Sequence, residues 1–255
     1  MKPYTLITGA SSGIGLELAR IAARENNNLV LVARDEKNLK DVANELKKLK
    51  VNVEYLSIDL SKSGASKKVF DFCENKKIFV SALINNAGFG DYGNFAQSDI
   101  KHQLSMIDLN VKTVTELTHL FLPAMIKNKC GKILNLGSVA AFLPGPLMSI
   151  YFATKNFVLS FSRALSEELR GTGVTVTCLC PGATNTGFGK AAHVSETHST
   201  AHPKTTARDV AEFGWYQMQS GEPVAIYGFE NKLSIFMTKF VPRNLLPRLV
   251  KRIQK

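Results

Sequence analysis

The stretch TGASSGIG, residues 8–15, follows the short apolar run Leu6-Ile7 and precedes a segment whose apolar residues recur at helical spacing. This pattern places three glycines on a turn between a strand and a helix. Such a turn leaves the first helical N–H groups unpaired at the positive end of the helix dipole, where a phosphate can accept hydrogen bonds. Runs of Gly and Ser also form ordinary loops, and the spacing here differs from the common G-x-G-x-x-G fingerprint. The rest of the chain must therefore decide between a loop and a nucleotide site.

The remaining sequence alternates apolar strand candidates with helical segments. Continuous apolar strands joined by helices predict a parallel sheet covered on both faces. We expect one doubly wound, Rossmann-like α/β domain over residues 1–255, because no linker, repeat or low-complexity tract interrupts it. Ligands of such folds bind beyond the carboxyl ends of the strands, where the glycine turn lies. The seven predicted strands are Thr5–Thr8, Leu29–Ala33, Val53–Ser57, Ser81–Ile84, Lys132–Leu136, Val174–Leu179 and Val224–Ile226.

Composition limits the classes of function. The chain has 255 residues, a hydrophobic content of 45% and a formal net charge of +11. It lacks a membrane-spanning apolar run and a signal peptide, so we expect a soluble, cytoplasmic protein. Cys178 and Cys180 alternate along one strand, which predicts reduced packing residues rather than a redox or zinc pair. Its basic residues are dispersed and no nucleic-acid-binding motif is present, so nucleic acid is not an expected partner.

The end of the second predicted strand bears on the choice of cofactor. Ala33 ends the strand and Arg34 follows it. In a dinucleotide fold an acidic residue here binds the 2′-hydroxyl of NAD, whereas an arginine accommodates the 2′-phosphate of NADP. A shift of one residue in the strand end would make Asp35 the ribose ligand instead. We therefore favour NADP and keep NAD as the alternative.

Three further stretches follow strand ends or open a helix, and one of them carries a pair suited to proton transfer. They are Asn85-Asn86-Ala87-Gly88, Ser138 and the helical pair Tyr151 and Lys155. Residues four apart lie on one helical face, so the ammonium can approach the phenol. A neighbouring cation favours the phenolate and lowers a pKa that is otherwise near 10. We expect Lys155 to act on Tyr151 in this way.

These motifs, in this order and spacing, resemble those of the short-chain dehydrogenase/reductase family, in its short single-domain subtype. The resemblance covers roughly residues 3–230 and extends to 3-ketoacyl and hydroxysteroid reductases. It implies that Asn110, Ser138, Tyr151 and Lys155 are catalytic, with Asn110 kinking its helix. Together with Arg34, it implies a cofactor site formed by Gly9, Ser11, Ser12, Gly13, Ile14, Gly15, Asp59, Leu60, Asn86, Ala87, Gly88, Tyr151, Lys155, Pro181, Gly182, Thr184 and Thr186.

The implied reaction is reversible hydride transfer between a small ketone or aldehyde and its alcohol. Tyr151 would supply the proton, Lys155 would lower its pKa and bind the ribose, and Ser138 would polarise the carbonyl. One departure concerns Ser12, because many NADP-using relatives have a basic residue there. A catalytically idle NADP-binding sensor is the alternative, but such a protein should have lost a member of the catalytic set.

The segment 187–206 is polar, contains glycine and lies where the family has a mobile lid over the substrate. Its three histidines do not match a metal-binding spacing, so no metal site is expected. We expect an apolar substrate pocket, lined by Phe89, Phe142, Leu143 and Phe188.

The segment 231–255 predicts a basic amphipathic extension with a helix from Pro247. It could pack over the pocket, form a subunit contact or attach to an anionic membrane surface. We favour the first two over the membrane. The resemblance implies association through the helices carrying Asn110 and Tyr151, and the segment 111–122 has a second apolar face, which together predict a homodimer or homotetramer.

Overall fold

The computed structural model describes residues 3–192 and 205–253. Its centre is a seven-stranded sheet of order β3-β2-β1-β4-β5-β6-β7, in which every neighbouring pair is parallel. The predicted doubly wound fold is confirmed, and each predicted strand lies within about a residue of an observed one. The strands are β1 (Tyr4–Thr8), β2 (Asn28–Ala33), β3 (Val53–Ser57), β4 (Val80–Asn85), β5 (Gly131–Leu136), β6 (Val174–Cys180) and β7 (Val224–Ile226).

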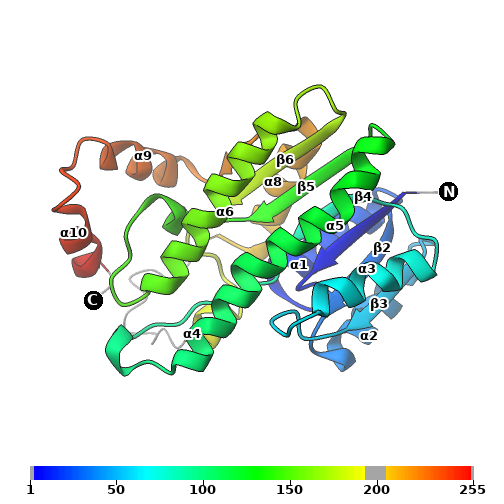
Figure 1. The fold of residues 1–255 in the computed structure, drawn as a ribbon, viewed down its shortest axis with the longest axis horizontal. Helices are drawn as coiled ribbons and strands as arrows, with labels where there is room; N and C mark the ends of the chain where they lie inside the picture. Colours follow the sequence, from blue (N-terminus) through cyan, green and yellow to red (C-terminus); the bar gives the residue numbers. More distant parts are fainter. Residues whose placement is uncertain (1–2, 193–204, 254–255) are drawn as a thin grey trace.

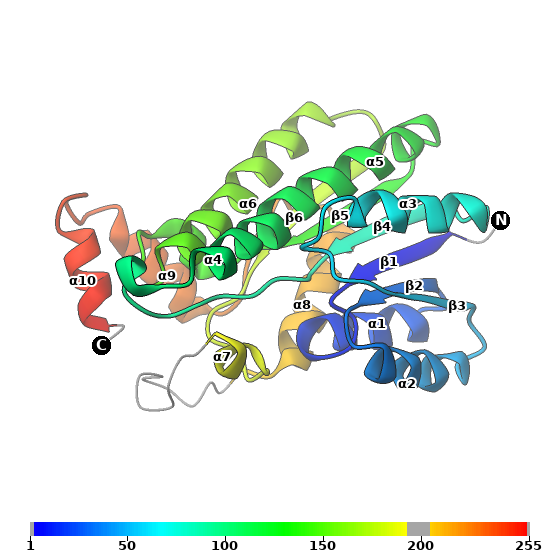
Figure 2. The same cartoon turned by 60° about the horizontal axis from the view of Figure 1, so that its bottom comes forward.

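Helices cover both faces of this sheet, as Figures 1 and 2 show. One face packs against α1 (Gly13–Arg24), α2 (Glu36–Lys47) and α8 (Ala207–Ser220). The other packs against α3 (Ala65–Asn75), α5 (Thr113–Lys127) and α6 (Ser149–Glu168). Because helices cover both faces of the sheet, the strands are almost continuously apolar. Strand β2, for example, is buried at all of its positions.

The order of the strands reverses beside β1. From β1 the chain runs outward through β2 to β3, and then returns to place β4 on the other side of β1. A reversal of this kind opens a crevice beyond the carboxyl ends of the two strands at which it occurs. The glycine turn, which follows β1, lies at this point.

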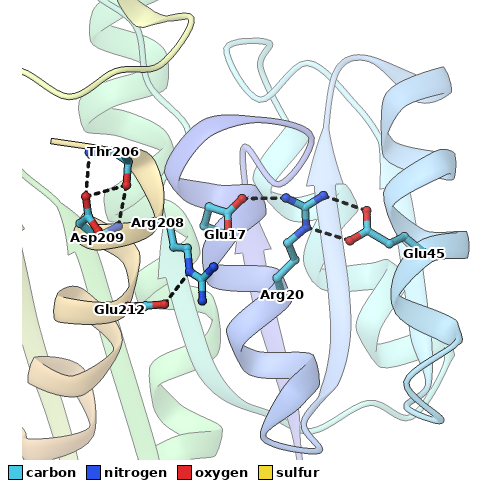
Figure 3. Close-up of polar contacts among 7 residues, drawn as sticks. All are labelled: Glu17, Arg20, Glu45, Thr206, Arg208, Asp209 and Glu212. Carbon is cyan, nitrogen blue, oxygen red and sulfur yellow. Dashed lines mark hydrogen bonds and ion pairs between the residues drawn. The ribbon is translucent and has the colours of Figure 1, made fainter. Parts of the chain in front are cut away.

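The helix that follows the glycine turn is tied to α2 by an ion pair of Arg20, which also pairs within its own helix, as Figure 3 shows. Arg20 of α1 donates to Glu17 at 2.7 Å and to Glu45 of α2 at 2.8 Å and 2.9 Å. The hydrogen bond with Arg20 is the largest cause that lowers the pKa of the Glu45 carboxyl. Exposed pairs of this kind contribute about 0–1 kcal/mol, so burial provides most of the force that packs these helices.

Short elements surround the carboxyl end of the sheet. A 3₁₀ turn, η1 (Phe95–Gln97), precedes α4 (Ile100–Ile107), which continues through the π-helical segment η2 (Asp108–Lys112) into α5. A second 3₁₀ turn, η3 (Val139–Phe142), follows β5, and α7 (Phe188–Ala191) follows β6. Cys178 and Cys180 are buried with free thiols whose Sγ atoms lie 3.7 Å apart, as their alternation predicted.

The C-terminal extension contains two helices, α9 (Phe229–Thr238) and α10 (Leu246–Ile253). The second begins one residue before the predicted start. In Figures 1 and 2 both helices lie at the end of the molecule toward which the strands point. Within the two described ranges of the chain, no helix is both long enough and apolar enough to span a bilayer.

Candidate active site

The glycines of the turn after β1 are required by backbone conformation and by close contact. Gly9 and Gly13 have φ values of +66° and +57°, which L side chains rarely adopt. Gly15 has ordinary dihedrals, but a Cβ there would collide with the Gly9 carbonyl oxygen and with Nδ2 of Asn86. The turn therefore folds tightly against the loop after β4 and leaves bare backbone at the head of α1.

The N-terminus of α1 receives no cap from its own side chains. Ser12 occupies the N-cap position, but its hydroxyl makes no capping hydrogen bond, and the first turn contains no acidic residue. Ser11 is half-buried beside it, and the half-buried Ile14 packs against the core on the α1 side of the sheet. The first amides of α1 are thus left to an acceptor from outside the helix, which suits a pyrophosphate.

The motif after β4 acts as a clamp on this turn. Nδ2 of Asn86 donates to the carbonyls of Thr8 at 2.9 Å and Gly9 at 3.2 Å. The backbone amides of Asn86 and Ala87 both donate to Oγ1 of Thr8 at 3.0 Å. A Cβ at Gly88 would lie 3.0 Å from Oδ1 of Asn110 and 3.6 Å from Nζ of Lys155. The clamp thus joins the glycine turn to Asn110 and Lys155, two of the predicted catalytic side chains.

The end of β2 resolves the ambiguity between Arg34 and Asp35. The strand ends at Ala33, and Asp35 is the N-cap of α2, where its carboxylate accepts from the backbone amide of Asn38 at 3.0 Å and from the Asn38 side chain at 2.7 Å. Arg34 is exposed at the strand end. The Asp35 carboxylate, which was the alternative ligand for the ribose, is therefore engaged as a helix cap. The Arg34 guanidinium is the charged group left at this strand end.

The next strand contributes Asp59 and Leu60 to the same edge. Burial alone would raise the pKa of the Asp59 carboxyl, but hydrogen bonds from the hydroxyl and amide of Ser61 lower it. Leu60 is buried, and its carbonyl accepts from Oγ1 of Thr113 at 2.7 Å. Asp59 is therefore held ionised and fixed by Ser61.

Asn110 lies in the π-helical segment η2, so the predicted helix irregularity is confirmed. Its side chain is buried and fully engaged. Nδ2 donates to the Phe89 carbonyl at 2.9 Å and to Oγ1 of Thr154 at 3.1 Å, while Oδ1 accepts from the Phe89 amide at 3.2 Å. Asn110 thus fixes the loop after β4 to helix α6 at Thr154, which lies about one turn after Tyr151 and directly before Lys155.

Ser138, Tyr151 and Lys155 converge beyond the carboxyl end of β5. Ser138 ends the loop after that strand, and its Oγ accepts from the Ala140 amide at 3.1 Å. Tyr151 is 9% exposed, and Lys155 lies one helical turn later, with Nζ 5.8 Å from the phenol ring centroid and 2.7 Å from the Leu136 carbonyl oxygen. The predicted pairing of phenol and ammonium is present.

The protonation of this pair differs from the sequence-based expectation. Burial raises the pKa of the Tyr151 phenol to about 12, and a hydrogen bond with Ser138 only partly opposes it. Burial also lowers the pKa of Lys155 to about 8. The expectation of a Tyr151 pKa below its ordinary value near 10 is therefore wrong for this site, because loss of hydration on burial raises the pKa more than the hydrogen bond with Ser138 lowers it.

The loop after β6 closes the site from the other side. The Pro181 carbonyl accepts from the Val139 amide at 3.0 Å, and Gly182 packs so closely against Asn231 that a Cβ would overlap it. Oγ1 of Thr184 donates to the Gly182 carbonyl at 3.0 Å. The methyl group of Thr186 faces Gly13, which brings this loop to the glycine turn.

The predicted lid, residues 187–206, is anchored at both ends. The Asn185 amide donates to the Thr205 carbonyl at 2.9 Å, and Asn185 and Thr206 form an isolated bridge. Residues 193–204, which include the three histidines, lie outside the described residues. Among the residues that are described, no group of three or more His, Cys, Asp and Glu side chains could hold a metal.

Two of the four predicted pocket residues lie beside Tyr151. Phe188 places its ring centroid 5.3 Å from that of Tyr151, and Phe89 packs in the same cluster. Phe142 instead packs against the hydrophobic cluster that includes Cys178 and Cys180, and Leu143 is half-buried outside both clusters. Their assignment to the pocket next to Tyr151 is therefore not supported by the packing.

Several residues of the site were not predicted. Thr8 orders the clamp, Thr154 holds Asn110, and Gly90 leaves room for Tyr151 and Phe188, whose atoms lie 3.2 Å and 2.9 Å from the position of a Cβ there. Asn85 belongs to a buried chain in which it donates to Asn135 at 2.8 Å and Asn135 donates to Ser162 at 2.9 Å. Thr154 lies inside the motif YFATK, but its partner is distant in sequence, so spacing alone could not reveal it.

Comparison with known proteins places this site in a family. Residues 3–196 match the family model described as short chain dehydrogenase. The chain is 38% identical over 190 residues, 74% of this chain and 75% of the relative, to sulfoacetaldehyde reductase 2 of Chromohalobacter salexigens. It is 34% identical to the human very-long-chain 3-oxoacyl-CoA reductase over 70% of this chain, a match that spans 58% of that protein.

Solved structures give the same result. A short-chain dehydrogenase from Sphingobium yanoikuyae in complex with NADPH is 33% identical, with a TM-score of 0.84 over 95% of this chain and 94% of that one. A bulky-bulky ketone specific alcohol dehydrogenase from Comamonas testosteroni is 30% identical, with a TM-score of 0.79 over 93% and 92%. The chain therefore belongs to the short-chain dehydrogenase family and is an oxidoreductase of that family.

Proposed function

We propose that this protein is an NADP(H)-dependent oxidoreductase that interconverts an apolar ketone or aldehyde and its alcohol. The observation that carries the proposal is the meeting of two features at one sheet edge. Ser138, Tyr151 and Lys155 converge beyond β5, and α1 presents uncapped amides beyond β1. The first feature suits proton transfer and the second suits a dinucleotide pyrophosphate.

The residues fit the cofactor. A Cβ at Gly9 would lie 2.7 Å from Nδ2 of Asn86, so the turn can fold against the loop after β4 only without a side chain there. Gly13, Gly15 and the amides of α1 would hold the pyrophosphate, while Thr184 and Thr186 would hold the nicotinamide end. When bound, NADPH supplies a hydride to the carbonyl carbon of the substrate.

The remaining chemistry belongs to the protein. The Ser138 hydroxyl orients the substrate oxygen, and Tyr151 donates its phenolic proton to that oxygen as negative charge develops. With its pKa near 12, the phenol is fully protonated at neutral pH and ready to act as an acid. Lys155, with a pKa of about 8, is still mostly charged at pH 7 and stabilises the phenolate that remains. Asn110 positions both through Thr154 and the Phe89 backbone.

Arg34 supports the preference for NADP over NAD. It lies at the end of β2, and the neighbouring carboxylate of Asp35 is occupied as the cap of α2. Replacing Arg34 with Ala should weaken NADPH binding by roughly 10- to 100-fold, as expected for loss of a charge-assisted contact of about 1.5–3 kcal/mol, and should barely alter NADH binding. Titration calorimetry with both cofactors measures this, with Arg24→Ala on the exposed end of α1 as the control. Equal losses for both cofactors would refute the assignment.

The substrate class rests on the aromatic surroundings of Tyr151, where Phe89, Phe152 and Phe188 pack. The names of the relatives include a reductase of long 3-oxoacyl chains and an alcohol dehydrogenase for bulky ketones, which accords with an apolar carbonyl. The direct test is a screen of ketones, aldehydes and secondary alcohols in which NADPH consumption or formation is followed by absorbance. A protein that binds NADPH tightly but turns over none of them would be the idle sensor considered above.

A homodimer or homotetramer formed through α5 and α6 remains a prediction. It is supported by the exposed side of α6, where Phe157 is 38% exposed and stacks on Phe161 with ring centroids 5.8 Å apart. Light scattering at micromolar concentration would decide it, and a mass of 28.0 kDa would count against it.

A further inference from the structure

Helix α9 is amphipathic in the unusual sense that its apolar face points away from the protein. Its half-buried positions, Asn231, Ile235 and Thr238, recur at the spacing of one helical face. That face packs on the body, because Asn231 donates to the Tyr227 carbonyl at 2.7 Å and lies against Gly182 of the site loop. The helix buries none of its residues fully.

The opposite face is formed by large apolar side chains. Phe229 is 77% exposed and Phe240, just past the helix end, is 69% exposed. Leu233, Phe236 and Met237 lie between them at helical spacing and are each about half exposed. Such a continuous exposed apolar surface indicates an interaction site rather than ordinary surface composition.

Basic side chains border this face. Lys232 and Lys239 lie along one flank of α9, and Nζ of Lys239 is 5.6 Å from the Phe236 ring centroid. Arg243, Arg248, Lys251 and Arg252 follow, all exposed. Glu230 is the single acidic residue in the range 229–253.

The apolar face with its basic border, residues 229–252, is here called the C-terminal face. We propose that it docks on an anionic lipid bilayer, with the Phe, Leu and Met side chains inserted at the level of the headgroups and the Lys and Arg side chains on lipid phosphates. Amphipathic helices with aromatic and aliphatic residues on one side and Lys and Arg beside them bind membranes in this way. The positive charge of the basic border complements the negative charge of lipid headgroups, and this favours an anionic bilayer as the partner.

A second copy of the chain fits the C-terminal face less well. A two-fold contact brings the same surface of both copies together, so the basic residues of one copy would meet those of the other. Like charges placed opposite each other across an interface oppose association. Packing onto the body, which is expected from the sequence together with a subunit contact, accounts for Val250 of α10, which is 6% exposed, but leaves the α9 face uncovered.

Docking would bring the active site to the membrane. Helix α9 follows β7 and packs on the Pro181-Gly182 loop, whose Pro181 carbonyl is bonded to Val139, next to Ser138. In Figure 2 it lies at the same end of the molecule as α7. If the proposed reductase function is correct, an apolar carbonyl dissolved in the bilayer would reach the site from this side. The docking itself does not depend on that function.

The test uses the full chain and sedimentation with vesicles. The protein should sediment with vesicles of phosphatidylcholine and phosphatidylserine at low salt, should be released as salt screens the attraction, and should bind vesicles of phosphatidylcholine alone far more weakly. The double variant Phe236→Ser/Phe240→Ser should bind at least about tenfold more weakly, because two apolar side chains no longer insert. Lys232→Gln/Lys239→Gln should weaken binding and reduce its dependence on salt.

The control is Tyr216→Ser on α8, which removes a 68% exposed aromatic side chain away from this helix and should leave vesicle binding unchanged. Because binding is read without turnover, failure of the proposed catalysis would not affect the result. No binding to anionic vesicles by the parent protein overturns the proposal. A change of oligomeric mass in Phe236→Ser/Phe240→Ser, without vesicle binding by the parent, would identify a subunit contact instead.

Discussion

Helices α1 and α8 pack against each other on one face of the sheet, yet their N-termini are built differently. At α8, Thr206 accepts from the Asp209 amide at 3.2 Å, and the Asp209 carboxylate accepts from the Thr206 amide at 3.0 Å, which completes a capping box (Figure 3). At α1, Ser12 makes no side-chain cap. Several of the helices that the structure describes lack a side-chain cap, but only at α1 among them does the uncapped end follow the glycine turn at the reversal of strand order, where it suits a ligand from outside.

A second contrast concerns the buried Lys155 of the site and the more exposed Arg20 of α1. Burial of Lys155 lowers its pKa to about 8, which means that its charge is held in the fold at a cost in stability. Arg20 on the outside of α1 has its pKa raised instead, chiefly by its hydrogen bond with Glu45. The ion pair of Arg20 is therefore satisfied within the chain, whereas the uncapped end of α1 and the buried charge of Lys155 are not fully compensated by it.

The largest effect expected on cofactor binding comes from giving α1 the kind of cap that α2 and α8 possess. Ser12→Asp places a carboxylate at the N-cap, which should stabilise the helix by a few tenths to about 1 kcal/mol. It should also weaken NADPH binding by about 100-fold, because the carboxylate competes for the amides and repels the pyrophosphate. Fluorescence titration with NADPH and thermal unfolding measure the two effects.

The matched control is Ser12→Asn, which has nearly the same shape and capping ability without the charge. It should retain most of the NADPH affinity that Ser12→Asp loses. Full retention of NADPH affinity in Ser12→Asp would mean that the α1 amides do not bind the cofactor, and the contrast with α8 would lose its meaning.

The next effect concerns Lys155. Its pKa falls from 10.5 to about 8 on folding, so charging it in the fold costs about 3 kcal/mol at pH 7. Lys155→Met should remove this cost but lose the bond to the Leu136 carbonyl, with a net gain in the free energy of unfolding of about 2 kcal/mol, while activity is lost.

The pH dependence of that gain provides an internal check. Between about pH 8 and 10.5 the unfolded chain binds more protons at Lys155 than the folded chain, so the stability of the parent protein rises with pH. The advantage of Lys155→Met should therefore shrink across this window. The exposed Lys40→Met on α2 should show neither effect, and a Lys155→Met protein less stable than the parent at pH 7 would contradict the assigned cause.

The smallest expected effect is on the free energy of unfolding and concerns α8, the helix that is capped. Thr206→Ala removes the capping box of α8 and should lower the free energy of unfolding by about 1 kcal/mol, whereas Ser12→Ala should change it by only a few tenths. Thr206→Ala should leave NADPH affinity unaltered. Urea unfolding of both variants measures the difference, and equal losses would show that Ser12 does cap α1.

The sequence predicted most of the framework because that information is local. Strand limits follow from apolar runs bounded by turns, and the motifs around Gly9, Asn86, Ser138 and Tyr151 follow the strands at fixed distances. Asp35 could not be separated from Arg34, because a difference of one residue in the strand end decides which side chain caps the helix.

The properties that the sequence did not predict depend on the tertiary environment. The raised pKa of Tyr151 follows from burial among side chains that are distant in sequence. Phe142 was assigned to the pocket by proximity in sequence, but η3 turns it toward Val158 and Leu159. For the C-terminal face, periodicity reveals that an apolar side exists, and only the packed structure shows that the α9 side points outward.

The central claim is that Tyr151 serves the chemical step while the backbone around α1 serves the cofactor. Tyr151→Phe tests it most directly, with kcat measured on a ketone that the parent protein reduces and the Kd for NADPH measured in parallel. The account predicts that kcat falls by about 10²–10⁴-fold while the Kd stays within about twofold. Retention of more than about a tenth of kcat, or a loss of NADPH binding that matches the loss of turnover, would contradict it.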